Sequence, residues 1–150
     1  MAHEVNFYHL TVLPVERALP KLVEKIYAGG KKAVIRVSSV QRAEELDQLL
    51  WTYSPNDFLP HGLAHDTQAA EHPIVITEKD ENPNQSDILL MVGDAWSERW
   101  QDFERCLLMF DGHRQDELAF ARRQWQTIKE QGVTLTYWKQ TEQGSWQKAA

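Results

Sequence analysis

Two short apolar runs in the second half of the chain constrain the fold most. The segments Asp87–Val92 and Cys106–Phe110 are almost continuously apolar, which is typical of strands buried on both faces of a parallel sheet. Parallel strands need crossover connections, which are usually helices, and helical patterns do alternate with the apolar runs along this chain. The sequence therefore predicts the α/β class, as a three-layer sandwich with a largely parallel sheet.

The rest of the chain supplies the other elements that such a fold needs. Further strands are expected at Val5–Leu10, Ala33–Val37, Pro73–Thr77 and Val133–Trp138. Apolar spacing predicts helices over about 19–27, 40–50 and 113–131, and a short helix at 97–103. Ser38 and Ser39 can cap the second helix, and residues 64–72 are expected to form a loop. We expect a single domain over residues 1–150, with a polar C-terminal tail from about 140.

The charge pattern limits the kinds of partner. The net charge of −6 argues against a nucleic-acid binder, because that function normally needs a basic surface. The balance is uneven: residues 1–110 hold 10 Lys and Arg against 17 Asp and Glu, whereas residues 111–150 hold 6 against 5. An anion site is therefore expected in the C-terminal part. With no stretch typical of a signal peptide or a membrane span, we expect a cytoplasmic protein without a membrane partner.

Motifs for catalysis and cofactor binding are missing from the sequence. Neither G-x-G-x-x-G nor the P-loop pattern occurs, and Gly29-Gly30 follows a helix instead of a strand. Cys106 lies within a predicted core strand and is expected to be an inert, buried thiol. We expect no cofactor and no catalytic residue. A small nucleotide-dependent enzyme that uses the strand-end crevice around Asp94 and Asp111 stays as the alternative.

Three histidines lie close together in the middle of the sequence and are candidates for a metal site. His61, His65 and His72 could form one together with Asp66, but no His-Glu-x-x-His pattern or cysteine partner accompanies them. We therefore expect surface or core histidines and no metal.

The last predicted helix carries a short basic ridge. Arg122, Gln126 and Lys129 fall at i, i+4 and i+7, Arg123 lies beside them, and Trp125 lies near the border. Such a ridge can hold a peptide carboxylate and a neighbouring apolar side chain, because arginine offers a two-pronged hydrogen bond. The spacing alone favours the other interpretation, in which these cations only solvate the surface and complement the helix dipole.

The connection after the second helix combines large apolar groups with backbone-restricting prolines. It contains Trp51, Phe58, Pro60 and His61. The aromatic side chains can plug one end of the core, or they can anchor a partner protein, since large rigid aromatics are common at interface hot spots. The spacing alone does not separate these interpretations.

Taken together, these segments resemble a known family. The likeness rests on Val5–Leu10, the segment from Leu50 to Leu63, Asp87–Leu89 and Gly132–Lys139, and it covers nearly the whole chain. On these residues the chain resembles the chi subunit of bacterial DNA polymerase III, an accessory protein of the clamp-loader complex. The resemblance implies a Rossmann-like fold without nucleotide-binding loops, and a non-catalytic adaptor of DNA replication.

The resemblance also implies partners and their sites. Chi proteins grip the acidic, phenylalanine-ended C-terminal tail of single-stranded DNA-binding protein, and they bind the psi subunit or a competing helicase; contact with DNA would be indirect. Trp51 and Phe58 match the aromatic contacts for psi or the helicase, with Pro60 and His61 in the same segment. Arg122 and Trp125 match the tail-binding residues, with Arg123 and Lys129 beside them. The best-known members carry lysines where this chain has Leu118 and Gln126.

Overall fold

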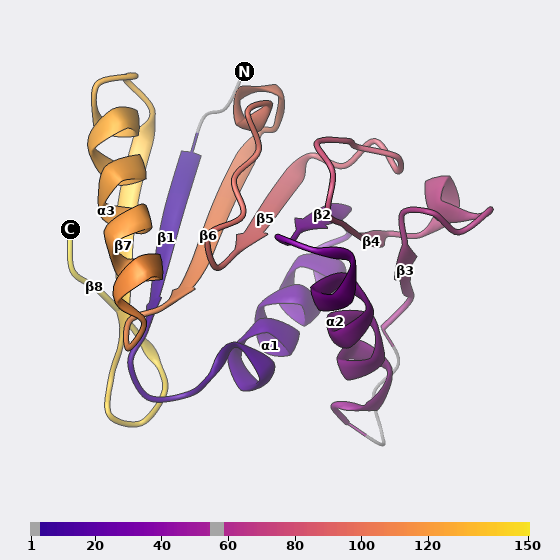
Figure 1. The fold of residues 1–150 in the computed structure, drawn as a ribbon, viewed down its shortest axis with the longest axis horizontal. Helices are drawn as coiled ribbons and strands as arrows, with labels where there is room; N and C mark the ends of the chain where they lie inside the picture. The colour runs from indigo at the N-terminus through magenta and orange to yellow at the C-terminus, as the bar shows by residue number, and fades with distance from the viewer. Residues whose placement is uncertain (1–3, 55–58) are drawn as a thin grey trace.

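The computed structural model describes residues 4–54 and 59–150, and one mixed sheet runs through this part of the chain (Figure 1). The strands are β1 (Glu4–Leu10), β2 (Ala33–Arg36), β3 (His61–Leu63), β4 (Ile74–Thr77), β5 (Ile88–Val92), β6 (Arg105–Asp111), β7 (Thr134–Gln140) and β8 (Trp146–Lys148). Their order in the sheet is β3-β4-β2-β5-β6-β1-β7-β8. Every neighbouring pair is parallel except β7 and β8, which pair antiparallel.

Three α-helices and two single 3-10 turns complete the described chain. They are α1 (Val15–Ala28), α2 (Val40–Thr52), α3 (Gln115–Lys129), η1 (Ala69–Glu71) and η2 (Trp100–Asp102). The predicted N-cap of the second helix is confirmed at Ser39, whose Oγ accepts a hydrogen bond from the backbone N–H of Arg42 at 3.1 Å.

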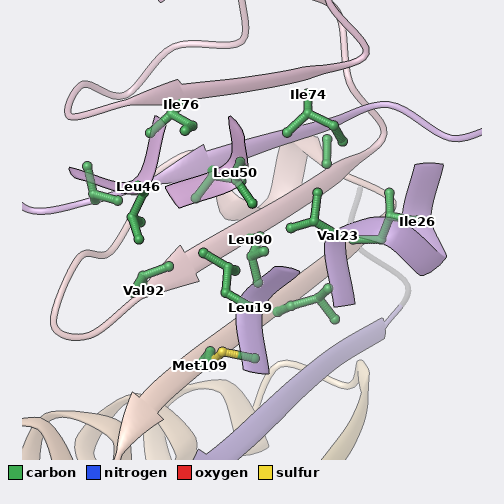
Figure 2. Close-up of a cluster of buried hydrophobic side chains, with 14 of the residues drawn as sticks. Leu19, Val23, Ile26, Leu46, Leu50, Ile74, Ile76, Leu90, Val92 and Met109 are labelled. Atoms are coloured by element: carbon green, nitrogen blue, oxygen red, sulfur yellow. The ribbon is translucent and has the colours of Figure 1, made fainter. Parts of the chain in front are cut away.

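The sheet separates two buried clusters, which confirms the predicted three-layer α/β sandwich. On the face that we call the first face, the apolar sides of α1 and α2 pack against the sheet, as Figure 2 shows for Leu19, Leu46 and Leu90. On the second face, α3 and the aromatic side chains of Trp100 and Phe103 cover the strands. All five residues of β5 are buried, as expected for a central parallel strand covered on both faces.

Strand periodicity determines which residue faces which cluster. In β1, Phe7 points to the second face and Tyr8 to the first, and in β7 the same alternation places Tyr137 on the second face and Trp138 on the first. This alternation positions the candidate binding residues described below.

The structure differs from the sequence predictions at three places. The segment from about 140, expected to be a polar tail, forms a hairpin in which Gly144 takes a φ of +83° and β8 returns along β7. His61–Leu63, expected to lie in a connection, pairs with β4 as an edge strand. The short helix expected at 97–103 is only the turn η2, although Trp100 and Phe103 are buried as predicted.

No helix in the described ranges is long and apolar enough to cross a membrane. The organisation of residues 1–150 as one domain stays a prediction.

The core on the first face gives a direct stability test. Leu46→Ala is expected to lower the free energy of unfolding by about 2 to 5 kcal/mol, because truncating a fully buried leucine removes contacts and leaves a cavity. Val40→Ala, on the same helix at a side chain that is 51% exposed, is the matched control and should change it by less than about 0.5 kcal/mol. Urea denaturation measures both, and equal stability of the two variants would contradict the described packing of α2.

Candidate protein-binding surfaces

Trp125 is held in a fixed orientation between α3 and the sheet. Its indole makes edge-to-face contacts with Phe7 of β1 and Tyr137 of β7, each with 5.4 Å between ring centroids. The rings of Phe7 and Tyr137 are themselves nearly parallel, 6.4 Å apart. Trp125 remains only half-buried, so one part of a preoriented indole faces solvent.

Arg122 lies close to the same aromatic cluster and to His9. The Arg122 cation lowers the pKa of Tyr137 against the larger raising effect of burial. Burial also lowers the pKa of His9, and the nearby Lys139 and Arg122 lower it further. The His9 imidazole Nδ1 lies 2.7 Å from the Tyr137 hydroxyl oxygen, so these two groups are joined by a hydrogen bond. Arg122, His9 and Tyr137 therefore form one electrostatically linked group beside Trp125.

The residues of the predicted basic ridge have different surroundings in the structure. The guanidinium carbon of Arg123 lies 5.9 Å from the centroid of the Phe120 ring, in the range of a cation–π contact. Lys129 is exposed in the last turn of α3, and Gln126 is exposed one turn before it. Leu118 is half-buried against the second-face core, so it adds apolar surface to this helix. Arg122 alone of the predicted cations is described beside the cluster of Phe7, Trp125 and Tyr137.

Within the described ranges, Arg122, Arg123 and Lys129 make no ion pair. These exposed cations are therefore available to an anionic partner. We call the area formed by Arg122, Trp125, His9 and Tyr137 the α3 surface.

Trp51 forms a second candidate surface at the end of α2. It is 46% exposed, and its ring centroid lies 4.3 Å from that of His61 at the start of β3. Pro60, which directly precedes His61 in the chain, is half-buried. The predicted contact residue Phe58 lies outside the described residues. We call the area of Trp51 and Pro60, backed by the His61 ring, the α2 surface.

His61 contacts Trp51 and is itself held by hydrogen bonds to the backbone. Its side chain is buried, with Nδ1 at 2.7 Å from the carbonyl oxygen of Leu59 and Nε2 at 2.9 Å from that of Asp47. The Nε2 atom also lies 3.3 Å from a carboxylate oxygen of Asp47. Because both ring nitrogens already face protein oxygens, His61 serves here to position Trp51 instead of offering a free nitrogen to a ligand.

The two surfaces lie far apart on the sheet. The α2 surface is next to β3 at one edge, whereas the α3 surface lies over β1 and β7 near the other edge. The helices that carry them pack on opposite faces. Figure 1 shows this separation between α2 and α3.

Other chemistry considered from the sequence finds little support. In the described ranges, no group of three or more His, Cys, Asp or Glu side chains is arranged to hold a metal ion. Cys106 is buried, its thiol contacts the carbonyl oxygen of Trp100 at 3.0 Å, and burial raises its pKa to about 12. Such a thiol is almost entirely protonated at neutral pH and makes a poor nucleophile.

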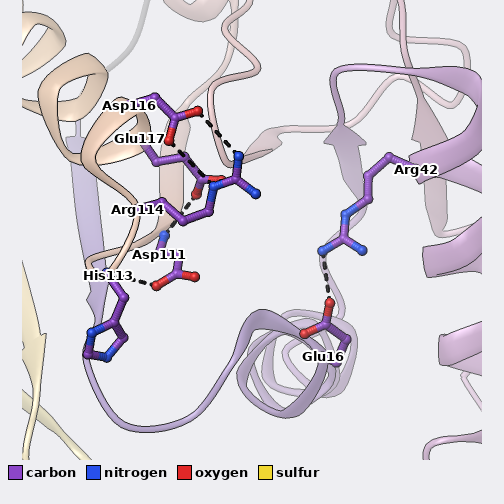
Figure 3. A network of polar contacts seen from close by, with 7 residues as sticks. All are labelled: Glu16, Arg42, Asp111, His113, Arg114, Asp116 and Glu117. Carbon is purple, nitrogen blue, oxygen red and sulfur yellow. Dashed lines mark hydrogen bonds and ion pairs between the residues drawn. The ribbon is translucent and has the colours of Figure 1, made fainter.

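The strand-end crevice of the alternative enzyme hypothesis exists, but it has the wrong charge for a nucleotide. Its volume is about 520 Å³, and its lining includes Asp94 and Asp111 together with Glu16, Glu45, Asp116 and Glu117. Two arginines lie among these carboxylates. Figure 3 shows that both are already paired: Arg42 with Glu16 at 3.1 Å, and Arg114 with Asp116 at 3.3 Å. This excess of carboxylates disfavours a polyphosphate.

Two residues of the α3 surface, His9 and Tyr137, were not among the predicted site residues, and neither was the nearby Lys139. Their proximity comes from the parallel register of β1 and β7, which pairs Phe7 with Tyr137 and His9 with Lys139. The alternation within Thr134–Gln140 would have placed Tyr137 on one face of its strand. Only the strand order places it beside Trp125.

The electrostatic link between Arg122 and His9 is testable by titration. The pKa of His9 in the folded protein is expected below 6.5, and Arg122→Ala should raise it because one repelling cation is removed. Because the pKa of His9 is lower in the folded protein than in the unfolded chain, His9 contributes stability that is fully present above the pKa of the unfolded chain. This stability begins to be lost as the pH falls through the pKa of the unfolded chain, and it is gone below the pKa of the folded protein.

NMR titration of the His9 imidazole measures the change in its pKa, with exposed Arg17→Ala on α1 as the control. An unchanged His9 pKa in the Arg122 variant would contradict the link.

Comparisons with known proteins agree with the resemblance seen in the sequence. Residues 2–136 match the family model described as "DNA polymerase III chi subunit, HolC". The chain is 37% identical over 89 residues to the "Probable DNA polymerase III subunit chi" of Rickettsia prowazekii (strain Madrid E), covering 59% of this chain and 54% of that protein. It is 38% identical over 80 residues to the "DNA polymerase III subunit chi" of Haemophilus influenzae (strain ATCC 51907 / DSM 11121 / KW20 / Rd), covering 51% and 56%.

The chain thus spans about half the length of the curated relatives that it matches. The family match itself extends over most of the present chain. With its three-layer sandwich and its match over residues 2–136, the chain belongs to the family of DNA polymerase III chi subunits.

Proposed function

We propose that this chi-family chain is a non-catalytic adaptor of the replication machinery. In this proposal the α3 surface binds the acidic C-terminal tail of single-stranded DNA-binding protein, and the α2 surface binds psi or a helicase. The observation that carries the proposal is Arg122, which makes no ion pair with the described residues and lies on the same helix as the preoriented indole of Trp125. Contact with DNA would then be indirect, through the single-stranded DNA-binding protein.

The α3 surface offers one group for each chemical feature of such a tail. Arginine can hold a terminal carboxylate through two parallel hydrogen bonds, which supports a role for Arg122. Trp125 and the aromatic rings behind it can enclose the terminal phenylalanine ring, since aromatic pairs favour edge contacts. Exposed Arg123 and Lys129 would attract the acidic residues that precede the terminal phenylalanine of the tail.

Two departures from the family pattern set the expected strength of binding. Leu118 packs against the core and Gln126 is neutral, so fewer cations surround the tail than in members that carry lysines there. We therefore expect Arg122 to carry a larger share of the interaction, and the dependence on salt to be moderate. The apolar contribution of Leu118 would partly offset the missing charge.

The α2 surface has the features of a protein anchor. Trp51 presents almost half of its surface to solvent while His61 fixes its ring from one side, and large aromatic residues of this kind dominate the energetics of protein interfaces. The distance between the α2 and α3 surfaces along the sheet would allow both partners to bind at once. These features support a bridging role.

Removal of the Arg122 guanidinium should weaken tail binding. We expect Arg122→Ala to lower the affinity for a labelled acidic tail peptide that ends in phenylalanine by about tenfold or more, since hydrogen bonds between charged groups contribute about 1.5 to 3 kcal/mol. Arg17→Ala removes another exposed arginine, on α1, and should bind like the wild type. Fluorescence anisotropy measures both proteins. Equal binding by the Arg122 variant and the wild type would rule out the assigned role.

Truncation of Trp51 should affect only the other partner. Trp51→Ala is expected to abolish co-purification with psi or a helicase from the native cell while leaving the affinity for the tail peptide unchanged, because the two surfaces are separate. Tyr27→Ala is the control, since Tyr27 is also a large exposed aromatic residue at 41%. Circular dichroism establishes that each variant is folded. Undiminished co-purification of a folded Trp51 variant would contradict the proposal for the α2 surface.

A further inference from the structure

A groove lies on the first face of the sheet, between α1 and the hairpin of β7 and β8. Its volume is about 810 Å³, within the range of pockets that enclose a ligand. Its apolar lining includes Tyr8, Leu22, Leu107, Trp138 and Trp146. The α3 surface lies on the opposite face, so this groove is a different place on the molecule.

The aromatic wall of the groove is fixed in place. The ring of Trp146 meets that of Tyr8 edge-on, with 5.0 Å between centroids, and the indole N–H of Trp138 donates to Asn6 Oδ1 at 2.9 Å. The hairpin is tied to the β1–α1 connection because the side-chain oxygen of Gln140 accepts three backbone N–H groups there. Both indoles are half-buried, so a preformed apolar surface faces the groove.

All charged residues in the lining of the groove are cations. Lys21, Lys25, Lys31 and Arg105 are among the lining residues, and no carboxylate is. Arg105 is paired with Glu4 at 2.7 Å, whereas the three lysines are exposed and make no ion pair within the described ranges. In a chain with a net charge of −6, this groove gathers unpaired positive charge next to tryptophan.

We propose that this groove binds an acidic peptide segment that carries a bulky apolar side chain. The apolar side chain enters between Leu22 and the tryptophans, and the carboxylates meet the lysines of α1. A peptide fits better than a nucleic acid or a membrane, because three lysines along one rim match a few carboxylates while the negative net charge of the chain repels an extended polyanion.

The proposal stands apart from the function proposed above. Trp138 and Trp146 lie beyond residues 2–136, so the hairpin wall is outside the region that matches the family model. Binding in the groove also requires no terminal carboxylate, because the side-chain carboxylates of the peptide can pair with the lysines.

The test uses an amidated peptide, Asp-Asp-Phe-Asp-Asp-Leu, which lacks the terminal carboxylate proposed for the α3 surface. In the ¹⁵N-labelled full chain, the indole N–H signals of Trp138 and Trp146 should shift on titration. Lys21→Glu should weaken binding by roughly fivefold or more, because the attraction between the lysine and a peptide carboxylate becomes a repulsion. Exposed Lys79→Glu is the control and should bind like the wild type.

Matched peptides separate the two required features. Asn-Asn-Phe-Asn-Asn-Leu lacks the charge and Asp-Asp-Ser-Asp-Asp-Ser lacks the apolar groups, and both should bind more weakly than the first peptide. Equal binding by all three would overturn the proposal, as would unshifted Trp138 and Trp146 signals. A shift of these signals with oligothymidylate or phosphatidylglycerol vesicles, but not with the acidic peptide, would overturn it as well. Arg122→Ala should leave this binding unchanged, so failure at the α3 surface is distinguishable from failure here.

Discussion

Burial of both faces of the central strands is the constraint on which the rest of the structure depends. β5 and the middle of β6 are apolar on both sides, so each face of the sheet must be covered. The described helices cover the centre, with α1 and α2 on one face and α3 on the other. Towards β1 and β7, single aromatic side chains complete the cover: Trp125 on the second face and Trp146 on the first. Such partial cover leaves aromatic surface for a partner.

The distribution of charge follows the same division. Carboxylates collect at the carboxyl ends of the strands, where Arg42 and Arg114 are already held in ion pairs. Cations that form no ion pair among the described residues, such as Arg122 on α3 and Lys21 on α1, lie instead beside the aromatic side chains. Although the net charge is −6, the α3 surface and the groove beside α1 are therefore two local regions that would attract an acidic chain. The crevice that a nucleotide enzyme of this architecture would use is lined by an excess of carboxylates, which disfavours an anion.

Local sequence patterns predicted those strands, helices and caps that depend only on residues close together in the chain. The apolar runs, the Ser39 cap and the amphipathic α3 follow from periodicity over a few turns, and they are present. β3 was missed because three residues with a central glycine show no alternation, and their pairing with β4 depends on the tertiary fold. The hairpin was missed because its polar sequence hides one apolar contact, that of Trp146 with Tyr8.

The β1–β7 pair joins the two regions of aromatic surface back to back. Adjacent residues of each strand face opposite sides: His9 and Tyr137 contribute to the α3 surface, whereas Tyr8 and Trp138 line the groove. A ligand on one side could affect the other only by shifting this strand pair, and the register is fixed by burial of both faces and by the bonds of Gln140. The two faces should therefore act independently. In the two proposals made above, this one strand pair would serve two acidic partners without conformational coupling between them.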